Sequence, residues 1–169
     1  LDNTLWGGVI GEDGLDGIQL DDGLPGAFHQ ELQRALQDLS DRGVLLAVCS
    51  KNNPEDALEA ISTHPGMLLR EKDFAALRIN WQEKARNLEE IAAELNIGVD
   101  ALAFLDDNPV ERQNIRLRLP EATVLELPED VAGWAAAVRE APAFQRLELS
   151  SEDGRRAEMY VQQRERKQL

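Results

Sequence analysis

The hydrophobic residues of this 169-residue chain follow two alternating patterns. Short continuous apolar runs, typical of strands buried on both faces of a parallel sheet, end at polar residues. Between these runs lie longer segments in which apolar residues recur every three to four positions, the period of an amphipathic helix. This alternation predicts an α/β fold, a doubly wound parallel sheet with helices covering both faces.

We expect strands at five places, the first being only the end of a strand: residues 1–6, 44–49, 75–79, 101–105 and 123–127. Helices are expected from Pro25, Pro54 and Pro109, because proline fits the first turn of a helix. A further helix is expected to open at Asn80, with Glu83 completing a capping box.

The segment between the first strand and the first helix is short and rich in glycine and aspartate. The apolar pairs at residues 9–10 and 18–20 flank it, which predicts a small hairpin or flap. One expected helix and one expected strand account for the whole stretch between residues 50 and 84. We therefore expect no large cap domain, and an open pocket that closes only through the flap or a partner.

The composition is that of an ordinary globular domain, with 43% hydrophobic and 30% charged residues. A net charge of −14 argues against nucleic-acid binding, which needs a basic face. No apolar run is long enough to cross a membrane, so no membrane association is expected. The single cysteine, Cys49, excludes an internal disulfide and fits a cytoplasmic location.

The C-terminal stretch departs from this acidic character. We expect residues 1–150 to form the main catalytic domain and residues 151–169 a basic helix that packs on it or extends from it. The cations of this helix are Arg155, Arg156, Arg164, Arg166 and Lys167. They could receive an acidic partner, although a solvated helix with cations in its last turn explains them equally well.

Residues that can carry chemistry stand where the expected strands end. They are Asp2, Ser50, Lys84 and the pair Asp106-Asp107. Ligands of open parallel sheets bind beyond the carboxyl ends of the strands. Carboxylates suit Mg²⁺, while a lysine and a hydroxyl can neutralise and bind a phosphoryl group. The order of these residues therefore predicts a magnesium and phosphate site.

Each residue also has a simpler explanation. Asp107 and Asn108 could cap the following helix, Ser50 could end a strand, and Lys84 could be a solvated surface residue. For each residue taken alone, the simpler explanation is the better one. The order of all these residues along the chain nevertheless favours a site. A receiver domain uses similar groups, yet its acid pair precedes the aspartate and the hydroxyl, so the order excludes it.

Five motifs resemble those of the FkbH-like family within the haloacid dehalogenase (HAD) superfamily. They are LDNTLWGGVIGEDG (1–14), AVCSKN (47–52), FAALRINWQEK (74–84), FLDDNPVER (104–112) and SEDGRRAEMYVQQR (151–164). Members of this family serve polyketide pathways. They are understood to dephosphorylate 1,3-bisphosphoglycerate, a three-carbon phosphate, and to load a glyceryl or lactyl unit onto an acyl carrier protein.

The resemblance implies a role for each matched residue. Asp2 would be the general acid/base and a metal ligand through its main-chain carbonyl, with Asp106 and Asp107 completing the Mg²⁺ site. Ser50 and Lys84 would bind the phosphoryl group. Neighbouring motif residues are expected to contact the substrate: Thr4, Lys51, Asn52 and Asn108. The nucleophilic aspartate of the first motif is expected immediately before Leu1.

Cys49 is open to two interpretations. As an acyl acceptor it would take the glyceryl group from the acyl phosphate before the carrier thiol, provided that a nearby cation lowers its pKa. As a structural residue it would simply be buried. Side chains alternate along a strand, so Cys49 should face away from the phosphate if Ser50 faces it. His29 and His64 are expected on a helix surface and in a loop, without a role.

Our first functional hypothesis is therefore a Mg²⁺-dependent FkbH-like phosphatase and acyltransferase. A HAD phosphatase without acyl transfer is the second hypothesis. A non-catalytic docking module, suggested by the basic C-terminal helix and the position of the expected nucleophile, is the third.

Overall fold

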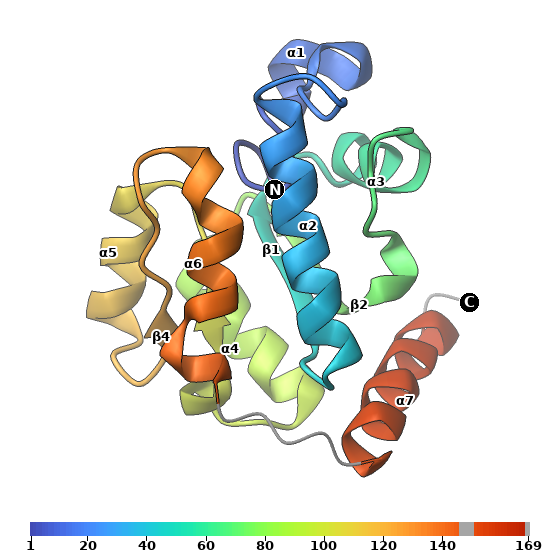
Figure 1. Ribbon diagram of the computed structural model, residues 1–169. Helices are drawn as coiled ribbons and strands as arrows, with labels where there is room; N and C mark the ends of the chain where they lie inside the picture. Colours follow the sequence, from blue (N-terminus) through green and yellow to red (C-terminus); the bar gives the residue numbers. More distant parts are fainter. Residues whose placement is uncertain (146–150, 168–169) are drawn as a thin grey trace.

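The structure is a computed structural model that describes residues 1–145 and 151–167 (Figure 1). The predicted domain boundary after residue 150 adjoins the segment 146–150, and residues 168–169 end the expected C-terminal helix. Both of these parts lie outside the described residues. None of the described helices combines the length and the apolar character needed to cross a bilayer.

The elements alternate as expected for an α/β fold. The helices are α1 (Ile10–Gly17), α2 (Gly26–Asp41), α3 (Pro54–Thr63), α4 (Lys84–Leu95), α5 (Pro109–Arg118), α6 (Trp134–Glu140) and α7 (Ser151–Lys167). The strands are β1 (Leu46–Lys51), β2 (Phe74–Asn80), β3 (Ala103–Phe104) and β4 (Thr123–Val124). Short 3-10 segments lie at Glu71–Asp73, Val99–Ala101, Val131–Gly133 and Pro142–Phe144. The predicted fold class, without a large cap, is confirmed.

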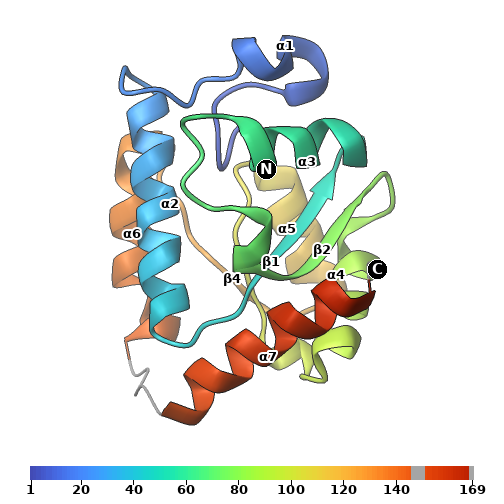
Figure 2. The same cartoon turned by 90° about the vertical axis from the view of Figure 1, so that its right-hand side faces the viewer.

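The strands form two parallel pairs. β1 pairs with β2, with Val48 opposite Leu77 and Ser50 opposite Ile79. β3 pairs with β4 over two residues. Figure 2 shows α2 and α6 on one side of the strands and α4 on the other. Separate apolar clusters join α2 to α6, and α4 to α5 and the strands.

An apolar cavity of about 460 Å³ separates the two strand pairs. Residues 44–49 line it from the side of β1 and residues 101–105 from the side of β3. Leu39 of α2 and Ile91 of α4 lie at its two faces, and Leu1 is also part of its lining. Within the described residues, β1 pairs only with β2 and β3 only with β4.

Residues 1–6 form a tight turn, so the expected strand end is wrong in this region. The amides of Thr4 and Leu5 both donate to the carbonyl of Leu1, and Asn3 has a positive φ of 53°. Asp2 and Trp6 form only an isolated bridge. The chain turns here because Asn tolerates the left-handed conformation that this turn requires.

The flap is present, but it is not a simple hairpin. Gly7 and Gln19 exchange two main-chain hydrogen bonds of 2.9 and 2.7 Å, which close its base. Its tip is helix α1, which is interrupted at Gly14, where φ is 70° and ψ is 176°. Only glycine adopts such a backbone conformation without a steric penalty.

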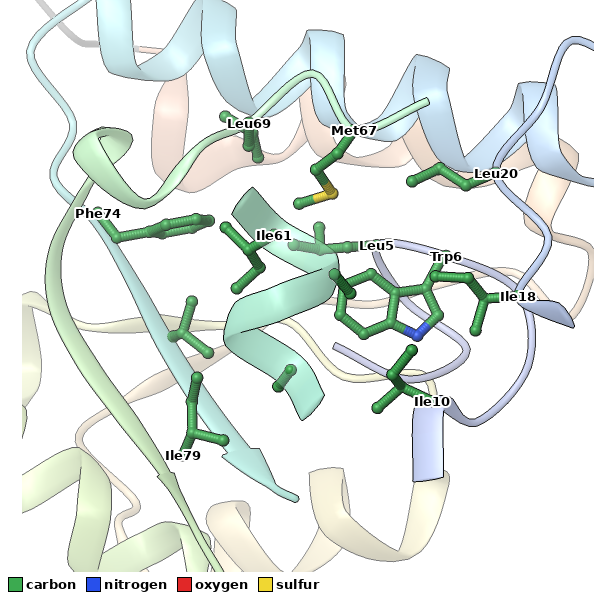
Figure 3. Close-up of a cluster of buried hydrophobic side chains, with 13 residues drawn as sticks. Leu5, Trp6, Ile10, Ile18, Leu20, Ile61, Met67, Leu69, Phe74 and Ile79 are labelled. Carbon is green, nitrogen blue, oxygen red and sulfur yellow. The ribbon is translucent and has the colours of Figure 1, made fainter. Parts of the chain in front are cut away.

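Trp6 holds the flap onto the body of the domain. Its side chain is fully buried, and Figure 3 shows it among Leu5, Ile10 and Ile18, with Ile61 of α3 nearby. Its indole nitrogen donates to Asp2 Oδ1 at 3.0 Å, which satisfies the one polar atom of a buried tryptophan. The flap therefore shares a core with the first motif.

Helix α4 begins later than the sequence indicates. Its first residue is Lys84, and Glu83 is the N-cap residue without a capping side-chain bond, so the capping box expected from Asn80 is wrong. The Asn80 side chain instead accepts from the amide of Gln82 at 3.0 Å and pairs with Asn87 of the helix. Asn80 therefore forms a turn between β2 and α4, because asparagine can bond main chain two residues ahead.

Helix α7 packs against β2 through Arg164, which is buried. Its guanidinium donates to the carbonyls of Phe74 at 2.7 Å and Glu71 at 2.8 Å, and lies 3.4 Å from the Glu71 carboxylate. Arg164 is therefore a docking residue and not part of an exposed basic patch. The other four cations of the helix are exposed: Arg155, Arg156, Arg166 and Lys167.

One side of α2 carries polar side chains that bind the main chain of the segments beside it. Gln33 is fully buried; its amide nitrogen donates to the Leu5 carbonyl at 2.8 Å. Its amide oxygen accepts from the main-chain nitrogens of Leu68 and Leu69 at 2.9 and 3.0 Å. Irregular segments leave main-chain groups without partners, and buried groups of this kind need one. Helix α2 supplies these partners.

Replacing Gln33 with leucine tests this role. Gln33→Leu keeps the volume but leaves three buried main-chain groups unpaired, so we expect the free energy of unfolding to fall by about 3 kcal/mol. Gln37→Leu is the matched control, since Gln37 makes one hydrogen bond, to the Leu68 carbonyl, and should lose about 1 kcal/mol. Urea unfolding measures both. Equal losses would show that the additional hydrogen bonds of Gln33 do not contribute to stability.

Candidate active site

Asp2 connects the first motif, the flap and the end of β1. Its Oδ1 accepts from the Trp6 indole and from the main-chain nitrogen of Ile10, both at 3.0 Å. Its Oδ2 accepts from the side-chain amide of Asn52 at 2.9 Å. Three donors from three segments fix the orientation of this carboxylate.

Lys84 and Asp106 form a buried ion pair. Lys84 Nζ lies 2.5 Å from Asp106 Oδ2, and the two side chains are 13% and 6% exposed. The other oxygen of Asp106 accepts from the main-chain nitrogen of Asn108 at 2.9 Å. A lysine at the first position of a helix opposes the helix dipole, so a nearby anion stabilises it there. Asp106 supplies this anion.

Asp107 lies beside Asp106 and is bound by Thr4. The Thr4 hydroxyl donates to Asp107 Oδ1 at 3.1 Å. Burial raises the pKa of Asp107 and the charge of Asp106 raises it further, while the hydrogen bond from Thr4 acts in the opposite direction. Two neighbouring carboxylates of this kind favour a cation between them, because a positive charge would stabilise the ionised form.

The main-chain nitrogen of Leu1 lies inside this group of residues. It is buried, and the charged groups that act on it are Lys84, Asp106, Asp2 and Asp107. The two acidic motifs and the lysine therefore lie in one region of the structure.

The remaining predicted residues lie around this centre with different roles. Ser50 is buried at the end of β1, and Asn52 binds Asp2. Lys51 pairs with Glu111 of α5 at 2.9 Å. Asn108 caps α5 by accepting from the main-chain nitrogen of Val110 at 2.9 Å, so its simpler explanation is confirmed.

The acidic residues fit a magnesium ion only as part of a larger ligand set. Among residues 1–145 and 151–167, no three His, Cys, Asp or Glu side chains are grouped so that they could hold a metal ion. Asp106 and Asp107 supply two carboxylates, and the main-chain carbonyl of Asp2 is an oxygen of the type that Mg²⁺ prefers.

His29 is a residue that the sequence analysis missed. It was expected on a helix surface, but it is buried, and its Nδ1 lies 2.6 Å from the carbonyl oxygen of Thr4. The spacing of His29 with Leu32, Leu36 and Leu39 could have shown this, because residues three and four apart share one helix face. His64 does lie at a helix end, where its Nδ1 accepts from the amide of Gly66 at 3.0 Å.

Cys49 faces the main chain of α4. Its Sγ lies 3.7 Å from the carbonyl of Lys84, and the side chain also lines the apolar cavity. Burial raises the pKa of the thiol to about 11, and the Lys84 charge only partly opposes this. A thiol with this pKa is protonated near neutral pH and is a poor nucleophile there.

The alkylation rate of Cys49 should report this environment. We expect iodoacetamide to modify it near neutral pH roughly 100-fold more slowly than an ordinary thiol, because two pKa units mean a hundredfold less thiolate. The rate should rise with pH up to about 11. Mass spectrometry of the alkylated protein as a function of pH measures it. A rate profile with an ordinary thiol midpoint would contradict the structure.

Comparison with solved structures gives one informative similarity. The chain is 43% identical to the "N-terminal part of the protein BF1531 from Bacteroides fragilis containing phosphatase domain complexed with Mg", with a TM-score of 0.83. The match covers 88% of this chain and 40% of that one, so this chain spans about two fifths of the length of the matched chain. No protein-family model matches the chain, and no curated protein matches it.

The fold is HAD-like. The identity and the TM-score together show that the two chains share their overall main-chain arrangement over the matched region. It supports the haloacid dehalogenase superfamily, while the narrower FkbH-like assignment remains a prediction. The HAD-like fold places the acidic motifs at the strand ends, as the sequence pattern indicates.

Proposed function

We propose that this chain is the catalytic domain of a Mg²⁺-dependent phosphatase of the HAD type. One observation carries the proposal. The Lys84–Asp106 ion pair and the bond from Thr4 to Asp107 bring the acidic pair and the lysine to the first motif, where Asn52 binds Asp2. The description of the Bacteroides fragilis domain as a phosphatase domain complexed with Mg supports the same activity.

Asp106, Asp107 and the main-chain carbonyl of Asp2 would hold the Mg²⁺ ion, together with the aspartate expected before Leu1. The bound ion would neutralise part of the phosphoryl charge. Lys84 would bind one phosphoryl oxygen by charge, and Ser50 would donate its hydroxyl to another. In this arrangement Asp106 orients Lys84 as well as contributing to the metal site.

The expected aspartate would attack the phosphorus atom and form an aspartyl phosphate, while the bond from phosphorus to the leaving oxygen breaks. Asp2 would donate a proton to a leaving group that needs one, and would take a proton from the water that then attacks the aspartyl phosphate. Trp6, Ile10 and Asn52 hold the Asp2 carboxylate in one orientation for both steps.

The finer proposal is an FkbH-like acyltransferase activity. The substrate would be 1,3-bisphosphoglycerate. The thiol of an acyl carrier protein would form a thioester with its acyl carbon while the bond to the acyl phosphate breaks and phosphate leaves, and hydrolysis of the second phosphate would give a glyceryl unit. A lactyl unit would require a separate reduction of this product. The five matched motifs support this proposal. A small flap in place of a large cap also supports it, because a carrier arm needs an open approach to the site.

Intact-protein mass spectrometry tests both levels of the proposal. A protein that includes the residues upstream of Leu1 is incubated with 1,3-bisphosphoglycerate, Mg²⁺ and a phosphopantetheinylated carrier protein. We expect a glyceryl adduct on the carrier and release of phosphate. Replacing the upstream aspartate with asparagine should reduce phosphate release at least 1,000-fold, because the nucleophile is lost.

The Cys49→Ala variant separates the two roles of the cysteine. Because the thiol faces the Lys84 carbonyl and has a raised pKa, we expect the adduct to survive this substitution. Loss of the adduct alone would establish Cys49 as the acyl acceptor. Phosphate release without any adduct would leave a phosphatase without acyl transfer, the second hypothesis. Absence of both Mg²⁺ binding and phosphate release would favour the non-catalytic docking module.

A further inference from the structure

His29 is buried between α6 and the first motif. Only 4% of its surface is exposed, and its ring meets that of Trp134 edge-on at a centroid distance of 6.0 Å. Its Nδ1 lies 2.6 Å from the carbonyl oxygen of Thr4, a residue 25 positions earlier in the chain. A buried imidazole with one short polar contact has a more specific role than filling space.

The contact with Thr4 shows which ring nitrogen of His29 carries the hydrogen. A carbonyl oxygen only accepts hydrogen bonds, so Nδ1 carries the hydrogen and donates it to Thr4. Burial lowers the pKa of His29, which keeps the ring neutral. Nε2 faces Gly7, where a Cβ atom would lie 3.3 Å from it. A side chain at position 7 would therefore crowd the ring, and glycine leaves room for it.

Thr4 connects His29 to the acidic centre, the group of carboxylates formed by Asp2, Asp106 and Asp107. It is itself 5% exposed, and its hydroxyl donates to Asp107 Oδ1 at 3.1 Å. The carbonyl of Thr4 is thus held by α2 while its side chain binds a carboxylate that follows β3. A turn that is fixed at its main chain keeps its hydroxyl in one place.

We propose that His29 is a positioning residue for the acidic centre: its hydrogen bond to Thr4 fixes the hydroxyl that orients Asp107. This inference rests on the proposed function, since Asp107 is there a ligand of Mg²⁺. His29 does not touch substrate or metal. It acts through Thr4, and removal of its donor should therefore change metal affinity and turnover without changing substrate binding.

Three substitutions separate the hydrogen bond from the volume of the ring. His29→Asn retains an N–H donor close to the position of Nδ1. His29→Leu retains an apolar side chain and removes the donor. Thr4→Val removes the hydroxyl through which His29 is proposed to act. His64→Asn is the matched control, because the polar contact that the structure describes for His64 is with the amide of Gly66.

The protein that includes the residues upstream of Leu1 is used for two measurements: the Kd for Mg²⁺ alone by calorimetry, and kcat and KM for phosphate release. We expect His29→Leu to raise the Kd and to lower kcat by roughly ten-fold each, with KM unchanged, as for residues that orient a metal ligand. His29→Asn should remain within about two-fold of the parent protein. In a Thr4→Val background, His29→Leu should add nothing, because both changes break one connection.

Two outcomes would overturn the inference while leaving the phosphatase intact. One is that His29→Asn is as impaired as His29→Leu, which would show that ring shape alone matters. The other is that His29→Leu and Thr4→Val are additive. A different pattern, in which the parent protein binds no Mg²⁺ and releases no phosphate, overturns the proposed function and the role of His29 with it. His64→Asn should match the parent in every measurement.

Discussion

The buried ion pair between Lys84 and Asp106 joins the two halves of this domain. Lys84 follows β2, in the first strand pair, and Asp106 follows β3, in the second. Neither charge is well solvated, and removing one partner of such a pair leaves the other charge buried at high cost. The ends of the two strand pairs are therefore held together where the chemistry is proposed. The hydrogen bond from Thr4 to Asp107 makes a second connection beside it.

Helix α2 also stabilises the site, through polar side chains that bind the loops around it. The loops around the site have few regular hydrogen bonds of their own, and α2 provides side chains that bind them. His29 binds Thr4, Gln30 binds the carbonyl of Gly66, and Gln33 binds Leu5 and Leu68. A helix is rigid, so polar groups on one face hold irregular loops at fixed distances from one another. The geometry of the site thus depends on a helix that supplies no ligand.

The sequence predicts this architecture wherever a local pattern determines it. The helices after Pro54 and Pro109 begin where expected, because proline favours the first turn of a helix. Lys84 lies after β2 and Asp106 and Asp107 lie after β3, as the sequence pattern predicts, whereas Asp2 lies in a turn. The turn at residues 1–6 was missed because its local hydrogen bonds to the Leu1 carbonyl are accompanied by contacts distant in sequence, such as that of Asn52 with Asp2. The start of α4 was missed for a related reason, since Asn80 pairs with Asn87 instead of capping the helix.

The apolar cavity between the strand pairs has a consequence for how the protein assembles. Two strand edges that face an apolar space accept extended apolar segments with little selectivity, which is the usual origin of edge-to-edge aggregation. Contacts across this space join residues far apart in sequence, and such contacts form slowly. The apolar strand edges are therefore most exposed to association with other chains before these long-range contacts have formed. The ion pair between Lys84 and Asp106 holds the strand ends together, whereas the apolar edges beside the cavity are the part of the sheet most vulnerable during folding.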